Sequence, residues 1–185
     1  MKKILVFGAS SSKNSINKRF AYYVGDLLAD AEITKIDLVD FEMPLYSIDR
    51  ERESGIPQKA IAFRNLVSEN DGIIISLAEH NGVYTAVFKN LFDWISRIEG
   101  GAWANKPMLL LATSPGPRGG STVLQIAANR FPWNNGNVVA TYSLPSYGEN
   151  FEEGIGIRDS ALQDQLKSVL TKFSESIQLP QEQVV

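Results

Sequence analysis

The stretch Gly72-Ile73-Ile74-Ile75-Ser76-Leu77, followed by Ala78-Glu79-His80-Asn81-Gly82, decides the fold of this 185-residue chain. The run from Ile73 to Leu77 is apolar except for one serine, a pattern typical of a strand buried on both faces. In a chain that alternates strands with helices, such a strand lies in the middle of a parallel sheet. The polar residues after it therefore leave a central strand at its carboxyl end, where open α/β sheets bind ligands.

Segments with strand-like and helical patterns alternate along the rest of the chain. We expect strands at residues 4–7, 32–38, 73–77, 108–112 and 138–142. We expect helices starting near residue 16, spanning 57–69 and 84–98, following Ser121 to about residue 130, and spanning 159–177. Either Ser15 or Asn14 is suited to cap the first helix, because its side-chain oxygen can accept from a free backbone amide. The sequence therefore predicts an α/β fold, a flavodoxin-like doubly wound five-stranded parallel sheet of order 2-1-3-4-5 with helices on both faces.

The length predicts one domain over residues 1–180 and a loose C-terminal tail at 181–185. Residues 39–56 contain Pro44, Gly55 and several charged side chains, so we expect a long surface excursion there. The helix at 84–98 has an apolar face wider than one stripe, which indicates deep packing or contact with a second subunit. Trp103 and Trp133 are interpreted as packing or interface aromatics.

The composition narrows the classes of partner. The chain has 18 basic and 21 acidic residues and no basic stripe, so we expect neither nucleic acid nor a membrane surface as partner, but a small molecule. It has no cysteine, which excludes disulfides and thiolate nucleophiles, and no metal site is predicted. The first apolar run stops at Gly8, too short for a signal peptide, so it is interpreted as the first strand of a cytoplasmic protein. No segment approaches the length of a membrane span.

Three polar loops follow the first, third and fourth predicted strands, and the predicted strand order makes these three strand ends neighbours. The first loop has Gly8 but lacks the second glycine of a phosphate-binding P-loop and the Ser/Thr after its lysine. Of the dinucleotide fingerprint G-x-G-x-x-G it has only the first glycine. It places serine hydroxyls and one lysine at a helix N-terminus, whose dipole favours an anion such as a phosphate monoester. The alternative is a serine-rich turn that only caps the helix.

The order of motifs resembles the NADPH-dependent FMN reductase family, which includes azobenzene, quinone and chromate reductases. The motifs that carry the resemblance are Gly8-Ala9-Ser10 with Ser15-Ile16-Asn17, Ala78-Glu79-His80-Asn81-Gly82 with Lys89-Asn90-Leu91-Phe92-Asp93-Trp94, Lys106-Pro107, and Ser114-Pro115-Gly116 before Gly119-Gly120. The resemblance covers residues 3 to 145. The second motif with its K-N-x-x-D-W continuation is the specific one.

The resemblance implies that FMN is the cofactor, with NADPH or NADH as co-substrate. It implies that the FMN phosphate binds the first loop, that the flavin ring lies along the second, and that the third closes over it. The cofactor-binding residues expected on this basis are Ser10, Ser12, Lys13, Ser15, Asn17, Ala78, Glu79, His80, Asn81, Gly82, Ser114 and Gly116. Two positions depart from the family pattern P-E-Y-N-G. Ala78 stands where the family has proline, and His80 stands where it has tyrosine. The common first-loop arginine falls on Ser12, leaving Lys13 as the nearby cation.

Several of these residues have a structural alternative. His80 is the only histidine and is interpreted either as a surface residue or as one that flanks the flavin or second substrate. Glu79 either orients the flavin edge or is a solvated acid, and Asn81-Gly82 is also a strong turn signal. Arg118 is an exposed cation or a contact for the phosphates of NADPH. A Ser/His/Asp hydrolase could combine Ser10 or Ser114 with His80, but it is not the expected function, because neither serine sits in a G-x-S-x-G elbow.

The resulting prediction is an FMN-dependent NAD(P)H oxidoreductase, an enzyme of the FMN reductase, quinone reductase or azo reductase type. Hydride would pass from NAD(P)H to flavin N5 and electrons then to a quinone, azo compound, free flavin or similar acceptor by ping-pong kinetics. No catalytic side chain is expected, because the flavin carries the chemistry. A homodimer or homotetramer is expected. Two alternatives stay open: a flavodoxin-type electron carrier without NAD(P)H activity, and a flavin-free regulatory or interaction protein.

Overall fold

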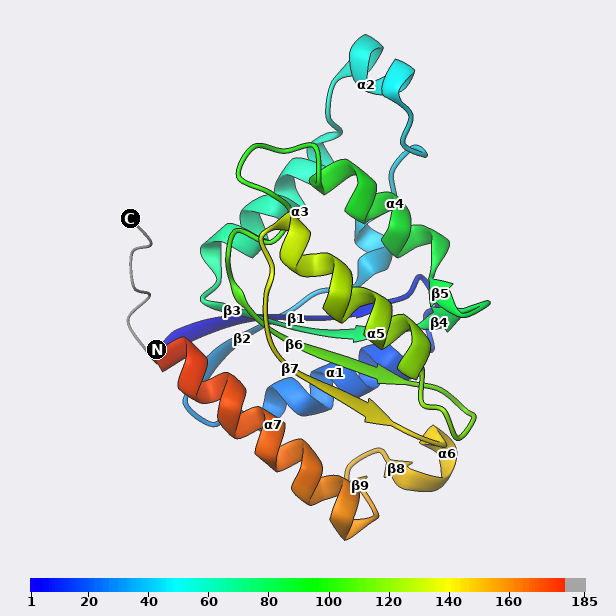
Figure 1. Cartoon of the computed structure of the whole chain (residues 1–185), viewed down its shortest axis with the longest axis vertical. Helices are drawn as coiled ribbons and strands as arrows, with labels where there is room; N and C mark the ends of the chain where they lie inside the picture. The colour runs from blue at the N-terminus through cyan, green and yellow to red at the C-terminus, as the bar shows by residue number, and fades with distance from the viewer. Residues whose placement is uncertain (179–185) are drawn as a thin grey trace.

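The computed structural model describes residues 1–178, so the predicted tail at 181–185 lies outside the described residues. Its centre is a five-stranded parallel sheet of order β2-β1-β3-β6-β7 (Figure 1). The strands are β1 (Lys2–Ala9), β2 (Ala31–Lys35), β3 (Gly72–Leu77), β6 (Pro107–Thr113) and β7 (Asn137–Leu144). This is the predicted flavodoxin-like order, so the predicted fold class is confirmed.

Helices cover both faces of the sheet, as the crossover rule requires (Figure 1). The α-helices are α1 (Ile16–Asp26), α2 (Ile48–Ser54), α3 (Gln58–Glu69), α4 (Ala86–Ile95), α5 (Ser121–Arg130), α6 (Tyr147–Asn150) and α7 (Ser160–Gln178), and the short 3-10 helices are η1 (Leu38–Phe41) and η2 (Phe131–Asn134). Buried side chains of α1 and α7 share one core with one face of the sheet, and those of α3, α4 and α5 share a second core with the other face.

The central strands are buried because their side chains are apolar on both faces. Every residue of β3 and β6 is buried, and alternate residues of β3 enter the two cores: Ile73 and Ile75 enter one, Ile74 the other. The edge strand β2 has no fully buried residue, as its alternating pattern predicts. It ends at Lys35, earlier than expected, because Leu38 turns into η1 and fills the core from there.

The predicted helix at 84–98 is shorter than expected. Val83–Tyr84 forms strand β5, which pairs with β4 (Glu79–His80), and Thr85 then caps α4 by accepting from the backbone N–H of Phe88 at 3.3 Å. The wide apolar face is deeply packed within the chain: the Phe88 and Phe92 rings stack 6.1 Å apart, and both lie over buried Trp103. Burying each such side chain contributes roughly 1.5–3 kcal/mol. Trp103 is therefore a core aromatic, whereas Trp133 is 80% exposed.

Two segments outside the predicted strands and helices contain short elements. The surface excursion at 39–56 carries α2, which has no buried residue and stands away from the body of the molecule (Figure 1). The segment after β7 forms α6 and a small antiparallel pair, β8 (Phe151–Glu152) with β9 (Gly156–Ile157). Within residues 1–178, no helix combines the length and apolarity needed to cross a membrane.

Candidate functional site

The three predicted loops meet at the carboxyl edge of the sheet. Ala9 at the end of β1 pairs with Leu77, and Leu77 pairs with Ala112 near the end of β6. A cleft of about 240 Å³ at this edge is lined by Ser10, Ser12, Asn14, Ser15, Ile16, Asn17, Ala78, Glu79, His80, Thr113, Ser114 and Pro115. The expectation that the three loops form one pocket is therefore confirmed.

The first loop presents unpaired polar groups to the cleft. Ser15 caps α1, its hydroxyl accepting from the backbone N–H of Lys18 at 3.2 Å. The backbone N–H groups of Ile16 and Asn17 donate to no atom of residues 1–178, as expected for the first turn of a helix. Ser10 is buried, and its hydroxyl accepts from the Ser12 N–H at 3.2 Å. This turn has the donors and the dipole direction that an anion requires.

Gly8 allows α1 to begin so close to the sheet. A Cβ atom at Gly8 would lie 2.4 Å from the backbone nitrogen of Lys18 and 2.5 Å from its Cα. Backbone atoms cannot yield to such a contact, so only glycine permits this approach of β1 and α1.

The Asn17 side chain points into the protein and uses most of its hydrogen-bonding capacity there. Its Oδ1 accepts from the Ser76 hydroxyl at 2.7 Å and from the Thr113 N–H at 3.0 Å, and its Nδ2 donates to the Thr113 carbonyl at 3.0 Å. Asn17 is 3% exposed. Its side chain thus joins the first turn of α1 to β3 and β6, and the group it turns toward the cleft with no partner is its backbone N–H.

The second loop is a tight hairpin. Asn81 and Gly82 connect β4 and β5 with φ values of 54° and 80°, the left-handed conformation that an Asn-Gly turn supplies. The predicted turn is therefore present. Ala78 is buried, and His80 is exposed at the mouth of the cleft.

Glu79 connects the second loop to α5. One oxygen of its carboxylate accepts from the backbone N–H of Val123 at 3.0 Å, in the first turn of that helix. The N-cap residue, Gly120, has no side chain to perform this function. A carboxylate at a helix N-terminus is favoured by the helix dipole, so Glu79 holds the hairpin against α5.

The third loop is fastened by the segment after β7. The backbone N–H of Ser146 donates to the Gly116 carbonyl and that of Tyr147 to the Ser114 carbonyl, each at 3.0 Å. The Thr113 hydroxyl donates to the Leu144 carbonyl at 2.8 Å, and the Ser114 hydroxyl donates to the Gly116 carbonyl at 3.2 Å. The loop is thus fixed at both ends before any ligand binds.

Not every predicted site residue lines the cleft. The lining includes Ser10, Ser12, Ser15, Asn17, Ala78, Glu79, His80 and Ser114, and does not include Lys13, Asn81, Gly82, Gly116 or Arg118. Lys13 and Arg118 are both exposed. A second lysine near the cleft, Lys18, is already paired with Asp37.

Sequence reasoning missed four residues that line the cleft: Asn14, Ile16, Thr113 and Pro115. Thr113 ends a buried apolar strand at the same edge as Ser76 and Leu77, so a polar residue at a strand end was the available signal. Among residues 1–178, no cluster of three histidine or acidic side chains could hold a metal ion.

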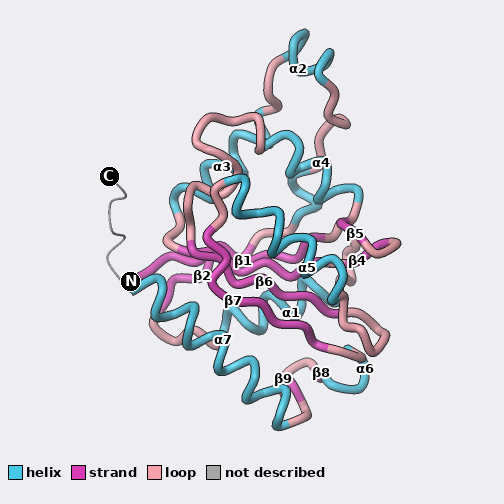
Figure 2. The backbone as a smooth tube through the Cα atoms, viewed as in Figure 1, coloured by secondary structure: helices cyan, strands magenta, loops and turns pink. Residues whose placement is uncertain are grey.

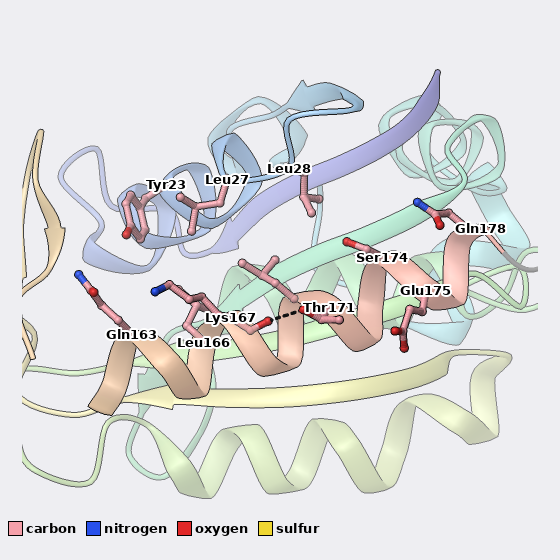
Figure 3. A pocket seen from close by; sticks show the side chains of 11 residues that line it. Tyr23, Leu27, Leu28, Gln163, Leu166, Lys167, Thr171, Ser174, Glu175 and Gln178 are labelled. Atoms are coloured by element: carbon pink, nitrogen blue, oxygen red, sulfur yellow. Dashed lines mark hydrogen bonds between the residues drawn. The ribbon is translucent and has the colours of Figure 1, made fainter. Parts of the chain in front are cut away.

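A larger hollow of about 490 Å³ lies elsewhere, between α1 and α7 (Figure 3). Its apolar wall includes Leu27, Leu28, Leu166 and Leu170. None of the predicted site residues lines it, and its lining comes from α1, the residues directly after α1, and α7. The chemistry expected from the loops therefore belongs to the smaller cleft at the strand ends.

The sheet order, with a polar cleft at the switch point between β1 and β3, defines a flavodoxin-like α/β protein. Residues 2–149 match the family described as NADPH-dependent FMN reductase, and the chain belongs to this family. The resemblance predicted from the motifs is thereby confirmed.

Curated relatives support the assignment. A 2-hydroxy-1,4-benzoquinone reductase from Burkholderia sp is 36% identical over 63% of this chain, and the chain spans 63% of that relative, somewhat less than two thirds of its length. A quinone reductase from Escherichia coli K12 is 29% identical over 74% of each chain. An uncharacterized MG342 homolog from Mycoplasma pneumoniae is 30% identical over 81% of this chain and 91% of its own.

Solved structures share the fold. FerB from Paracoccus denitrificans, a flavoenzyme NAD(P)H:(acceptor) oxidoreductase, superposes with a TM-score of 0.77 at 21% identity, covering 96% of this chain and 98% of its own. An NADH:FMN oxidoreductase in its apo form gives a TM-score of 0.67 at 18% identity, covering 98% of this chain and 92% of its own.

Family membership makes this chain an NAD(P)H-dependent oxidoreductase with FMN as cofactor, as predicted. The residues present fit a phosphate-bearing cofactor: the cleft offers the free amides of Ile16 and Asn17 and the hydroxyls of the first loop. No carboxylate other than Glu79 lines the cleft, and Glu79 is turned toward the Val123 amide.

Proposed function

We propose that the chain is a quinone reductase that binds FMN at the carboxyl edge of its sheet. The observation that carries the proposal is the meeting of three loops around unpaired amides of the first α1 turn. Ser10, Ser12 and Ser15 with these amides would hold the FMN phosphate, and exposed Lys13 would add a charge from the rim. Asn17 would contribute its backbone N–H, because its side chain already bonds β3 and β6.

The flavin ring is proposed to lie along the Asn81-Gly82 hairpin. The cleft is about 240 Å³, below the roughly 300–1,000 Å³ usual for ligand pockets, so part of the cofactor would extend beyond it. The neighbouring walls are buried Ala78 and the Ser114–Gly116 turn, whose carbonyls are held by backbone bonds from Ser146 and Tyr147. Backbone groups recognise a ring edge whatever side chains surround it, so the Ala78 and His80 departures are compatible with FMN.

The protein's own task is placement. Bound FMN supplies a hydride acceptor at N5 and later returns electrons to a second substrate. The chain would hold the nicotinamide and the acceptor in turn at the exposed side of the hairpin, beside His80, with Arg118 available to meet the phosphates of NADPH. Two substrates that share one open site must alternate, which gives ping-pong kinetics.

A quinone is the acceptor that the relatives favour, because the matched enzymes from Burkholderia sp and Escherichia coli K12 are both named for quinone reduction. Azo compounds and free flavin are further acceptors of the predicted class. A cytoplasmic location and a homodimer or homotetramer belong to the same proposal.

The test is an anaerobic visible spectrum of the purified protein, taken after incubation with FMN and desalting. We expect a retained flavin spectrum that bleaches promptly on addition of NADPH or NADH and recovers on addition of a benzoquinone. If the protein retains flavin that stays yellow with both nucleotides, the chain is an electron carrier and not an NAD(P)H-dependent reductase. A protein that retains no flavin would overturn the proposed site.

A further inference from the structure

The sequence contains the dipeptide Asn-Gly twice, at Asn81-Gly82 and at Asn135-Gly136. This dipeptide is chemically labile, because glycine has no side chain to keep its backbone nitrogen away from the side-chain amide of the asparagine. Both asparagines are exposed, and both have a left-handed backbone, with φ values of 54° at Asn81 and 61° at Asn135. Since the two pairs share sequence, exposure and this conformation, their contacts decide how each one reacts.

The pair at Asn135 is held by two hydrogen bonds. The Gly136 N–H donates to the Phe131 carbonyl at 2.9 Å, and Nδ2 of Asn135 donates to the Gly100 carbonyl at 3.1 Å. Gly136 is also buried, and a Cβ atom there would lie 3.0 Å from the Phe131 Cβ. Neither the backbone nitrogen nor the side-chain amide can move without breaking a hydrogen bond. This pair must therefore open locally before it can react.

The pair at Asn81 has neither of these restraints. The Gly82 N–H donates to no atom of residues 1–178, and the Asn81 side chain makes no hydrogen bond within the same residues. A Cβ atom at Gly82 would have only its chain neighbours within 4 Å. Figure 2 shows the tip of the β4–β5 hairpin projecting from the edge of the sheet. The Gly82 nitrogen is therefore open to reaction without any opening of the fold.

We infer that Asn81 is a site of spontaneous deamidation. The Gly82 nitrogen forms a bond to Cγ of Asn81 and gives up its proton, while the bond from Cγ to Nδ2 breaks and ammonia leaves with that proton. Water then opens the resulting succinimide ring at either of its carbonyls. The product is an aspartyl residue, or an isoaspartyl residue whose main chain contains one extra carbon atom. Water is the only co-reactant, and nothing is oxidised or reduced.

The modification changes the hairpin along which the flavin ring is proposed to lie, so its effect on FMN rests on the proposed function. A two-residue turn keeps His80 opposite Val83 in the β4–β5 pair. An additional main-chain atom changes the length of this turn. Either product also places a carboxylate beside a flavin that becomes negatively charged when reduced, and like charges repel. The converted chain therefore binds FMN more weakly than the intact chain.

The test follows both asparagines in the full chain, incubated at mildly alkaline pH with and without FMN. Trypsin places Asn81 in the peptide 65–89 and Asn135 in the peptide 131–158, and mass spectrometry measures the change from amide to acid in each. Digestion in water enriched in oxygen-18 labels any conversion that occurs during digestion itself. Without FMN, Asn81 should convert roughly tenfold faster than Asn135 or more, because Asn135 reacts only after local opening.

Two variants connect the modification to FMN binding. Asn81→Gly removes the amide and keeps a residue that adopts the left-handed turn without strain. After incubation without FMN, the wild-type chain should bind FMN with a dissociation constant roughly threefold or more above its starting value, whereas Asn81→Gly should keep its value. Asn135→Gly is the matched control, and it should lose FMN affinity at the same rate as the wild type.

The outcomes separate this inference from the proposed function. If Asn81 converts no faster than Asn135, the inference is overturned whatever the FMN results. If Asn81 converts and the affinity for FMN does not fall, its effect on FMN binding is overturned. Bound FMN should slow the conversion, because the ring covers the hairpin. Rapid conversion that FMN does not slow would support the modification and contradict the proposed position of the flavin.

Discussion

The hydroxyl of Ser76 donates to Oδ1 of Asn17 at 2.7 Å, and both side chains are buried. This bond joins the central strand to the helix that opens the candidate site. Asn17 also bonds both backbone groups of Thr113, so one amide connects α1, β3 and β6. The site's first turn is thus held by a network that lies beneath the cleft.

Asn17→Ala should unfold the protein more easily. The change leaves the Ser76 hydroxyl and the Thr113 N–H buried without a partner, and each such group costs about 1–3 kcal/mol, so we expect a loss of about 3 kcal/mol. Urea denaturation of the flavin-free protein measures this directly. Asn14→Ala, which changes an exposed residue of the same cleft, should cost less than about 0.5 kcal/mol. A stable Asn17→Ala protein that has lost only FMN binding would show that the amide serves the phosphate instead.

Glu79→Ala should lower both stability and FMN affinity through the loss of one hydrogen bond. Without the carboxylate, the Val123 N–H at the start of α5 has no side-chain acceptor, a loss of about 1 kcal/mol for a helix cap. Glu79→Gln keeps an acceptor oxygen and should lose less. Thermal unfolding of the flavin-free protein and titration with FMN separate the two effects. Equal behaviour of the alanine and glutamine variants would argue against the cap.

His80→Tyr restores the residue usual in the family and tests the role of the exposed histidine. No hydrogen bond joins the His80 side chain to another of residues 1–178, so stability should change by less than about 0.5 kcal/mol. Turnover with quinone, or the KM for NAD(P)H, should change because the side chain lies at the mouth of the cleft. Steady-state kinetics with both nucleotides and a quinone measure this. Identical kinetics in the wild type and in His80→Tyr would show that the His80 side chain has no role in turnover or nucleotide binding.

Ionisation of Tyr84 should make the free energy of unfolding depend on pH in the alkaline range. Burial raises the pKa of Tyr84 from 10.0 to about 12, and its hydroxyl is buried with no partner among the described residues. As pH rises past 10, the unfolded chain loses this proton first, so the stabilisation present below pH 10 is lost between pH 10 and about 12. Tyr84→Phe should therefore lose less stability than the wild type over that range.

Tyr142 is the matched control for this prediction. Burial also raises the pKa of Tyr142 to about 12, but its hydroxyl donates to the Leu162 carbonyl at 3.0 Å. At pH 8 Tyr142→Phe should cost about 1 kcal/mol, whereas Tyr84→Phe should be neutral or stabilising. Urea midpoints from pH 8 to 11.5 provide the comparison. A Tyr84→Phe protein that is less stable at pH 8 would mean that the hydroxyl has a partner.

The sheet order was predictable because a strand that is buried on both faces has a continuous apolar sequence. The runs at 73–77 and 108–112 could occupy only central positions, and the alternating run after residue 31 only an edge. The loops that follow such strands necessarily meet at one edge, which explains why most predicted site residues line one cleft.

The contacts that shape the cleft were not predictable because their partners lie far apart in sequence. Glu79 bonds Val123, which is 44 positions away, and Asn17 bonds Thr113, which is 96 positions away. Tyr84 fits the helical period of the residues that follow it, yet backbone pairing with Glu79 places it in a strand. The need for Gly8 appears only when α1 is seen against β1.

The K-N-x-x-D-W motif acquires a physical meaning in the structure. Residues 42–57, here called the arm, project from the body of the molecule and carry α2 (Figure 2). Asn90 and Trp94 hold the base of the arm, and Lys89 pairs with Asp93 on the exposed side of α4 at 2.7 Å. A backbone segment with no secondary structure needs partners for its polar groups, and the asparagine supplies one acceptor and two donors. The motif therefore concerns arm position rather than flavin chemistry.

Asn90→Ala should release the arm. It removes three hydrogen bonds to residues 43–46, worth about 2 kcal/mol together because the freed groups can reach water. The local opening should speed cleavage within residues 45–55 by trypsin, which has Arg50 and Arg52 as sites, by roughly tenfold or more. Lys89→Ala breaks only an exposed pair on the same helix and should change stability by less than about 0.5 kcal/mol. Equal cleavage rates in the wild type and Asn90→Ala would show that the arm is held by its apolar contacts alone.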